Sequence, residues 1–276
     1  MVVFAAKTFL FSAIKSTHMN NYTLITGASK GIGKAIAKEA ASRGRNLLLV
    51  ARSLDLLEQL ASDMRKQYNI KVEVLSVNLF KPDSPDLIFQ FANEKGLNVD
   101  MLINNAGMGY CGHFDETDLA LQLRIIQLNV DSCVRMAHVF LSKTDSSQRR
   151  YILNVSSVAA YQPIPYMTIY AASKSFIQSF SRGLRHELKP KNVHVTALSP
   201  GGTETEFFKD AQMEDIVKKN AQFMMSADEV AKVGFDALLK NKSVVVPGWM
   251  NKVGAVVSKL VPHNIVVPVA AKIYQK

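Results

Sequence analysis

The sequence predicts an α/β fold of the doubly wound type, in which a parallel sheet of about seven strands has helices on both faces. Short β-branched or leucine-rich runs alternate with helix-length segments along most of the 276 residues. Runs such as 47–50 are continuously apolar, which is typical of parallel strands buried on both faces. With 48% hydrophobic and 20% charged residues, the composition is ordinary for one globular domain.

Seven strands are expected, and each except the last precedes a helix-length segment. They are Tyr22–Thr26, Asn46–Val50, Lys71–Val77, Met101–Ile103, Tyr151–Val155, Val193–Leu198 and Val244–Val246. Ser53 is expected to cap the helix after the second strand, while Ser226 and Glu229 predict a capping box before the last strand. Pro190 is expected to end the helix that carries Tyr170.

The chain is expected to hold one catalytic domain over residues 19–248, with an extension at each end. Residues 1–18 are apolar but too short to span a bilayer, so an upstream start codon or a surface helix is preferred to a signal or anchor. The apolar extension 249–276 belongs to the same domain and contains two pieces separated by Pro262. It can cover the substrate mouth, form a subunit contact or rest on a membrane surface. Packing onto the domain or a partner subunit is the favoured expectation.

The formal charge of +10 does not by itself indicate nucleic acid, because lysines and arginines are spread along the helices without a basic tail. A basic surface that attracts an anionic cofactor is the simpler interpretation, and no nucleic-acid partner is expected. Two cysteines, Cys111 and Cys133, make neither a disulfide framework nor a metal-ligand cluster. A cytoplasmic location and no metal site are therefore expected.

A glycine-rich turn at residues 26–33 follows the first strand and opens a helix, the context in which such a turn predicts dinucleotide binding. Gly27 permits the tight turn, Gly31 lets the backbone approach a pyrophosphate, and Gly33 lets helix and strand pack closely. The phosphates would face the helix N-terminus. The remaining expected contacts from this turn are Ser29, Lys30 and Ile32.

The end of the second strand indicates which nicotinamide cofactor is preferred. An acid there usually binds the ribose hydroxyls, whereas an arginine suits a 2′-phosphate. This chain has Arg52 and no acid before Asp55, and Lys30 adds a second positive charge from the glycine turn. The sequence therefore predicts NADP(H) over NAD(H).

Tyr170 and Lys174 are four residues apart, about one helical turn, and so project from one face of a helix. A neighbouring ammonium favours the phenolate, which would draw the tyrosine towards proton exchange near neutrality. Ser157 lies thirteen residues upstream of the tyrosine, at a strand end, where its hydroxyl could hold a substrate oxygen. Ser156 competes for that role, because adjacent strand residues point to opposite faces.

These motifs, together with Asn104-Asn105-Ala106-Gly107, Asn129 and Pro200-Gly201, resemble the short-chain dehydrogenase/reductase family over roughly residues 20 to 248. The resemblance implies a Rossmann-type fold and hydride transfer between a nicotinamide and a carbonyl or alcohol. It selects Ser157 over Ser156, and it implies that Asn129 helps to hold a water leading protons to Lys174. Ser157 and Tyr170 would contact the substrate.

The resemblance also implies further cofactor contacts. Lys174 would hold the nicotinamide ribose, and Asn78 and Leu79 would lie beside the adenine, although the family often has an aspartate in place of Asn78. The adenosine side would be lined by Asn105, Ala106 and Gly107. The residues near the nicotinamide carboxamide would be Pro200, Gly201, Thr203 and Thr205.

Between Gly201 and Ser226 the family has a mobile lid over the substrate, and here the segment is rich in phenylalanine and methionine, which suits an apolar substrate. These residues can equally pack the lid onto the core. The lid candidates are Phe207, Phe208, Met213, Phe223, Met224 and Met225. Other candidate walls are Met108, Tyr110, Phe114, Tyr161 and Tyr166.

The sequence thus predicts an NADP(H)-dependent carbonyl reductase or alcohol dehydrogenase acting on a fairly apolar small molecule. A cofactor-binding regulatory or scaffold protein is the alternative, although its expected signature, loss of Ser157, Tyr170 or Lys174, is absent. An epimerase or dehydratase would ordinarily need a longer C-terminal part. The resemblance also implies a dimer or tetramer formed through the helices predicted at Asp115–Leu141 and Met167–Lys189.

Overall fold

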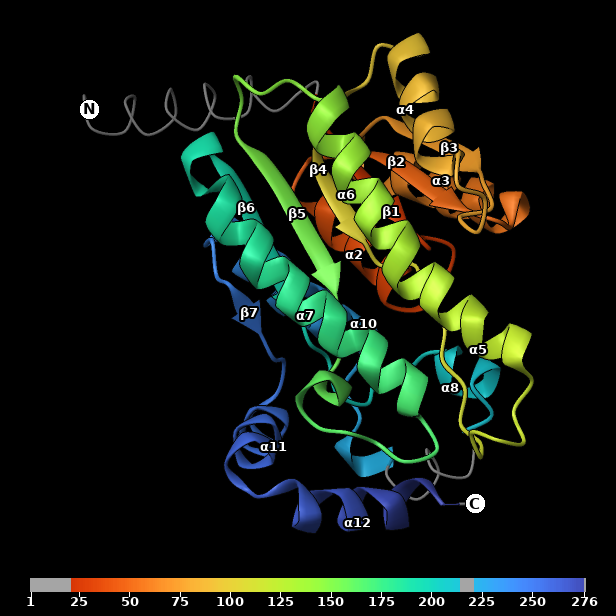
Figure 1. Ribbon diagram of the computed structural model, residues 1–276. Helices are drawn as coiled ribbons and strands as arrows, with labels where there is room; N and C mark the ends of the chain where they lie inside the picture. Colours follow the sequence, from red (N-terminus) through yellow and green to blue (C-terminus); the bar gives the residue numbers. More distant parts are fainter. Residues whose placement is uncertain (1–20, 214–220, 276) are drawn as a thin grey trace.

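The computed structural model describes residues 21–213 and 221–275 (Figure 1). The expected N-terminal extension at 1–18 lies outside the described residues. Seven parallel strands form one sheet in the order β3-β2-β1-β4-β5-β6-β7. The strands are β1 Asn21–Thr26, β2 Asn46–Ala51, β3 Val72–Ser76, β4 Asn98–Asn104, β5 Arg150–Val155, β6 Val193–Leu198 and β7 Val244–Val245.

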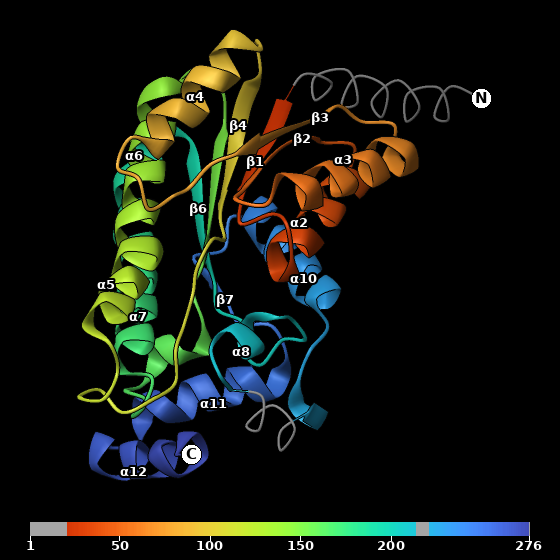
Figure 2. The ribbon, with the colours of Figure 1, turned by 90° about the vertical axis from the view of Figure 1, so that its right-hand side faces the viewer.

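Helices cover both faces of this sheet, so the predicted doubly wound fold is confirmed. Figure 2 shows α2, α3 and α10 on one side of the sheet and α4, α5, α6 and α7 on the other. The helices on the first side are α2 Gly31–Ser42, α3 Leu54–Tyr68 and α10 Ala227–Leu239. Those on the second side are α4 Ser84–Glu94, α5 Leu119–Ile126, α6 Ser132–Lys143 and α7 Thr168–Leu188.

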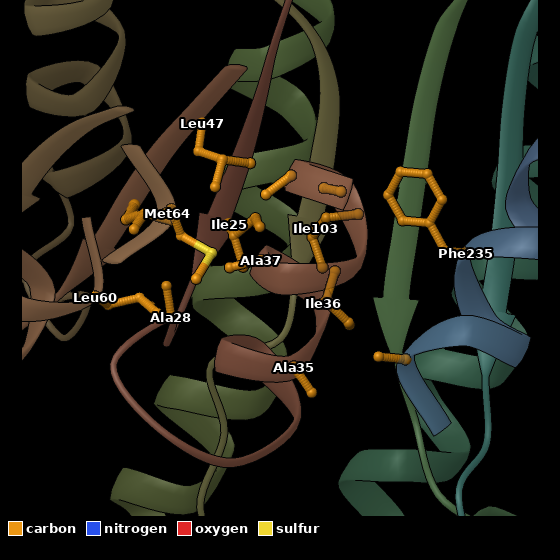
Figure 3. Close-up of a cluster of buried hydrophobic side chains, with 14 of the residues drawn as sticks. Ile25, Ala28, Ala35, Ile36, Ala37, Leu47, Leu60, Met64, Ile103 and Phe235 are labelled. Atoms are coloured by element: carbon orange, nitrogen blue, oxygen red, sulfur yellow. The ribbon is translucent and has the colours of Figure 1, made fainter. Parts of the chain in front are cut away.

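Strand β2 shows how one apolar run supplies both halves of the core. All six of its residues are buried. Leu47 and Leu49 join the cluster under α2, α3 and α10, whereas Leu48 and Val50 join the cluster under α4 and α6. Alternate strand residues point to opposite faces, so a strand covered on both sides must be apolar throughout. Figure 3 shows the first cluster, in which Phe235 of α10 packs on the same face.

The helix signals were partly right. The Ser226–Glu229 capping box is confirmed, with the Ser226 hydroxyl accepting from the Glu229 amide at 3.2 Å and the Glu229 carboxylate accepting from the Ser226 amide at 3.1 Å. Helix α7 ends at Leu188, before Pro190, as expected. The Ser53 prediction is right in position only: α3 begins at Leu54 with Ser53 as its N-cap residue, but the Ser53 side chain makes no capping hydrogen bond.

The helix expected over Asp115–Leu141 is confirmed in part: it runs unbroken from Leu119 to Lys143, but it starts four residues late and is not α-helical throughout. Helix α5 begins only at Leu119, where the Asp118 carboxylate accepts from the Leu121 amide at 2.8 Å. A π-helical turn over Gln127–Asp131 then separates α5 from α6. Such a turn winds one extra residue into the helix, and π turns frequently occur at functional sites.

Beyond the carboxyl ends of the strands the chain forms three helices that lie over this end of the sheet. After β6 comes the short helix α8, Phe207–Asp210, and after β7 come α11, Trp249–Leu260, and α12, His263–Tyr274. Helices α11 and α12 lie at the same end of the molecule in both views (Figures 1 and 2). This arrangement places the C-terminal extension at the end of the sheet where open α/β folds bind ligands.

Candidate active site

A cavity of about 420 Å³ lies at the carboxyl ends of the strands. Every site residue predicted from the sequence lines it except Gly33 and Asn129, which lie behind its wall. The predicted lining residues are Gly27, Ser29, Lys30, Gly31, Ile32, Arg52, Asn78, Leu79, Asn105, Ala106, Gly107, Ser157, Tyr170, Lys174, Pro200, Gly201, Thr203 and Thr205. Residues from seven separate segments of the chain therefore meet in one space.

The glycine turn forms a cradle that side chains would fill. Gly27 and Gly31 have φ values of +64° and +56°, which L side chains rarely adopt. A Cβ on Gly33 would lie 2.3 Å from the Gly27 carbonyl oxygen and 2.4 Å from the Asn105 amide nitrogen. Asn105 fixes the turn by donating to the carbonyls of Thr26, at 3.0 Å, and Gly27, at 3.1 Å. The turn and the N-terminus of α2 therefore fit a pyrophosphate.

Arg52 and Lys30, the two cations predicted to bind a 2′-phosphate, both line this cavity, but their surroundings differ. Arg52 is exposed directly after β2. Lys30 forms an ion pair with Asp210 of α8 at 2.5 Å, with both side chains about half exposed. Such surface pairs contribute little stability, so Asp210 is a weak competitor for Lys30. Asn78 uses its side-chain oxygen to accept from the Phe80 amide at 3.2 Å, which shapes the adjoining loop.

The structure distinguishes the two candidate serines. The Ser156 hydroxyl donates to the Lys174 carbonyl at 2.8 Å, so it is engaged with the backbone of α7. The side chains of Ser157 and Tyr170 are hydrogen-bonded to each other, and the Ser157 oxygen also accepts from the Ala159 amide at 3.1 Å. Ser157 is therefore the serine placed to share a substrate oxygen with Tyr170.

Burial dominates the protonation of the Tyr170–Lys174 pair. Loss of hydration raises the pKa of Tyr170 to about 12, against a smaller lowering effect of the Ser157 hydrogen bond. Burial also lowers the pKa of Lys174 to about 8. The expected lowering of the tyrosine pKa by Lys174 is thus not observed. The ammonium lies 5.7 Å from the centre of the phenol ring and donates to the Val155 carbonyl at 2.9 Å, and desolvation outweighs its field.

Asn129 lies in the π turn and joins three elements. Its amide nitrogen donates to the Met108 carbonyl and to the Ser173 hydroxyl, each at 2.9 Å, and its oxygen accepts from the Met108 amide at 2.9 Å. A Cβ on Gly107 would lie 3.1 Å from this oxygen and 3.4 Å from the Lys174 ammonium. The glycine therefore lets Asn129 and Lys174 approach the same short stretch of backbone.

The segment after β6 links the glycine turn to the C-terminal extension. Thr203 donates to the Gly201 carbonyl at 3.0 Å, and the methyl group of Thr205 lies 3.2 Å from the Cβ position of Gly31. On the other side, Asn251 of α11 occupies the space beside Gly201, 2.3 Å from where a Cβ would lie. The predicted nicotinamide end of the cavity is thus backed by α11.

The substrate end contains a residue that the sequence did not reveal. Tyr274 of α12 lines the cavity, and its backbone oxygen accepts from the Cys111 thiol at 3.5 Å. The Tyr170 ring lies 5.4 Å from that of Phe207. Among the predicted lid residues, the ones that line the cavity are Phe207, Phe208 and Met213. The only signal for Tyr274 was an aromatic residue in the apolar tail.

The other predicted walls lie outside the described lining of the cavity. Phe223 and Phe114 are exposed, and Met225 packs against the cluster under α2 and α10. Tyr166 packs against the cluster that contains Cys111. The remaining candidates outside this lining are Met108, Tyr110, Tyr161 and Met224. Met225 and Tyr166 therefore pack the segments around the cavity onto the core, which was the alternative to forming its wall.

The chain is similar to a known family and to characterised proteins. A family profile described as short chain dehydrogenase matches residues 21–215. The human 17-beta-hydroxysteroid dehydrogenase type 3 is 31% identical over 259 residues, covering 90% of this chain and 82% of the relative. The mouse very-long-chain 3-oxoacyl-CoA reductase is 29% identical over 254 residues, covering 86% and 79%.

Solved structures agree with this relationship. A short-chain dehydrogenase from Sphingobium yanoikuyae, in complex with NADPH, superimposes with a TM-score of 0.75 at 32% identity and covers 83% of this chain and 88% of that one. Family profile, relatives and structure lead to the same assignment. The chain belongs to the short-chain dehydrogenase/reductase family of nicotinamide-dependent oxidoreductases.

Proposed function

We propose that the protein is an NADPH-dependent reductase of a ketone carried by an extended apolar molecule, with oxidation of the alcohol as the reverse reaction. One observation carries this proposal. Ser157, Tyr170 and Lys174 line the same cavity as the glycine cradle, and the wall beyond them is built of phenylalanine, methionine and tyrosine. The chemistry and the cofactor cradle therefore share one apolar space.

The preference for NADPH follows from the charges at the adenosine end. Arg52 is exposed at the end of β2, and Lys30 lies in the glycine turn. A guanidinium pairs well with a phosphate, and its ribose-binding counterpart, an acid at the end of β2, is absent from the sequence before Asp55. The similar Sphingobium yanoikuyae enzyme was crystallised with NADPH, which supports the choice.

The bound nicotinamide supplies the hydride, and the chain supplies the proton and the geometry. With a pKa of about 12, Tyr170 is protonated at neutral pH, the state that a proton donor to a developing alkoxide requires. Ser157 shares a hydrogen bond with Tyr170 and can hold the same substrate oxygen. Lys174 would hold the nicotinamide ribose, and Asn129 fixes the backbone beside it.

The substrate class follows from the far wall of the cavity. Phe207, Phe208, Met213 and Tyr274 present aromatic and thioether surface next to Tyr170. Surfaces of this kind bind apolar molecules by burial and leave orientation to a few polar groups. Two of the similar proteins are named for a hydroxysteroid and for a very-long-chain 3-oxoacyl thioester, which supports an extended apolar ketone.

The test is to follow oxidation of NADPH and of NADH with a ketosteroid, 3-oxoacyl thioesters of short and long chain, and small water-soluble ketones. We expect kcat/KM to be higher with NADPH, and to rise with the apolar length of the ketone. A tighter dissociation constant for NADH would contradict the cofactor assignment. Tight NADPH binding without turnover of any ketone would instead favour the regulatory alternative.

A further inference from the structure

Helices α11 and α12 carry many of their large apolar side chains on the side that faces solvent, whereas a helix that only covers a core carries them on the side that faces the core. A surface helix normally turns its large apolar residues inward. Here Ala255 and Ala270 face inward and are 6% and 1% exposed, whereas Trp249 and Leu260 are 74% and 78% exposed. The favoured expectation, packing of the tail onto the domain, is met by Ala255, Ala270 and Tyr274, but not by these large outward side chains.

The outward residues form two regular stripes. Trp249, Val253, Val256 and Leu260 follow one another at helical spacing along α11, and Ile265, Val269 and Ile273 do so along α12. All seven are at least half exposed. We call these seven residues the tail face. Isolated exposed apolar residues are normal, but exposed apolar stripes at helical spacing on two consecutive helices indicate an interaction site.

Contacts on the inward side fix the rotation of both helices. In α11, Asn251 lies against Gly201, and Ser258 donates to the Gln162 side-chain oxygen at 2.7 Å. In α12, Tyr274 is held in the cavity wall. Neither helix can turn its apolar stripe inward without breaking these contacts, so the exposure of the tail face is built into the fold.

The charged side chains carried by these two helices are all of one sign. Lys252, Lys259 and Lys272 are exposed on the same two helices, and residues 249–276 contain no aspartate or glutamate. A two-fold contact with a second copy would bring these lysines near their own equivalents. An anionic lipid surface complements both features, because its headgroups attract lysines while its acyl boundary takes up apolar side chains.

We propose that the tail face docks the protein on the surface of an anionic lipid bilayer, with α11 and α12 lying in the interface. Within residues 21–213 and 221–275 no helix is long and apolar enough to cross a bilayer, in keeping with a surface contact. Tyr274 links α12 directly to the cavity, so docking turns the substrate end towards the lipid. Only this last consequence, delivery of an apolar ketone from the bilayer, rests on the proposed function.

The chain carries its own probe, because Trp249 is its single tryptophan. The full-length protein is mixed with vesicles of phosphatidylcholine, with or without a third of phosphatidylglycerol, and flotation and tryptophan emission are recorded. We expect co-flotation and a blue shift with the anionic vesicles, both weakened by high salt because exposed charges are screened. No binding to anionic vesicles at low salt would overturn the proposal.

Matched variants locate the contact. Val256→Asp with Leu260→Asp should abolish flotation, while Leu123→Asp, at a 54% exposed position on α5, should leave it unchanged. Each of Lys252→Glu and Lys259→Glu should weaken binding about five-fold or more. Retained NADPH binding shows that each variant is folded. Equal flotation of the double variant, or a dimer in sedimentation that this variant dissociates without any vesicle binding, would contradict the proposal, whatever ketone the enzyme reduces.

Discussion

The cofactor half and the substrate half of the cavity are built by different means. In the cofactor half, backbone approaches backbone, as where Gly33 lies against the Gly27 carbonyl, and the Asn105 amide fixes the turn. In the substrate half, side chains from distant segments form the wall, including Phe207 and Tyr274. Backbone geometry tolerates few residue types at each position, whereas an apolar wall tolerates many. One fold can therefore keep its cofactor while its substrate changes.

The largest effect is expected at the junction of the two halves. Tyr170→Phe removes the proton donor, so kcat/KM for ketone reduction should fall by roughly 10³- to 10⁴-fold. NADPH binding, measured by fluorescence, should change little because the ring remains. Tyr151→Phe, on β5 beside His194, is the matched control and should retain activity. Comparable turnover by the two variants would remove Tyr170 from the mechanism.

Arg52→Ala tests the charge of the cofactor half. Loss of a charge-assisted contact to a 2′-phosphate should raise the dissociation constant for NADPH roughly 10- to 100-fold and leave that for NADH nearly unchanged. Titration calorimetry with both cofactors measures the difference. Arg149→Ala, a variant away from the cavity lining, is the control. Equal losses for NADPH and NADH would mean that Arg52 acts on the fold or on a group common to both.

Two glycines differ in the space around them and so test whether close packing at the cofactor turn matters. Gly33→Ala forces a Cβ against backbone and should destabilise the protein by about 1–3 kcal/mol as well as weaken cofactor binding. At Gly183 in α7 no atom lies within 4 Å of the Cβ position, so Gly183→Ala should stabilise by about 0.5–1 kcal/mol. Denaturant unfolding measures both. A neutral Gly33→Ala would show that the turn can relax.

The pH profile tests the buried pair. Lys174, with a pKa of about 8, is charged below that pH and neutral above it, while Tyr170 stays protonated throughout. If the ammonium is required, kcat/KM for NADPH should be level below pH 8 and fall about tenfold per pH unit above it. Lys174→Arg, if active, should move this descending limb to higher pH because guanidinium stays charged. A level profile to pH 10 would contradict the requirement.

The smallest effect is expected in the substrate half. Tyr274→Phe removes only a hydroxyl and keeps the aromatic ring in the wall, so KM for the apolar ketone should change by less than about twofold with kcat retained. NADPH affinity should not change. A large fall in kcat with unchanged KM would instead give Tyr274 a part in the chemistry.

The residues that the sequence predicted for the cofactor half, except Gly33, line one cavity for a physical reason. Continuous apolar runs such as 47–50 identify parallel strands, and glycines at 27, 31 and 33 report backbone requirements at their own positions. What the sequence missed depends on distant packing. The place of Tyr274 depends on how α12 packs against the segment that carries Cys111, and the pKa of Tyr170 depends on burial by segments far along the chain. The Ser53 capping bond is missing because a residue type favours a cap position without ensuring the hydrogen bond.

Because Asn129 lies in the π turn at Gln127–Asp131, the number of residues in this turn determines where its amide points. Deleting a single residue there would convert the turn to ordinary helix, because the turn holds one residue more than an α-helical turn, while the helix on either side keeps its rotation. Asn129 would then lose Met108 or Ser173, although no side chain in the cavity had been substituted. The flanking helices would therefore keep their packing while the Asn129 amide lost its contacts. The direction of the Asn129 amide thus depends on the number of residues in the turn as much as on their identity.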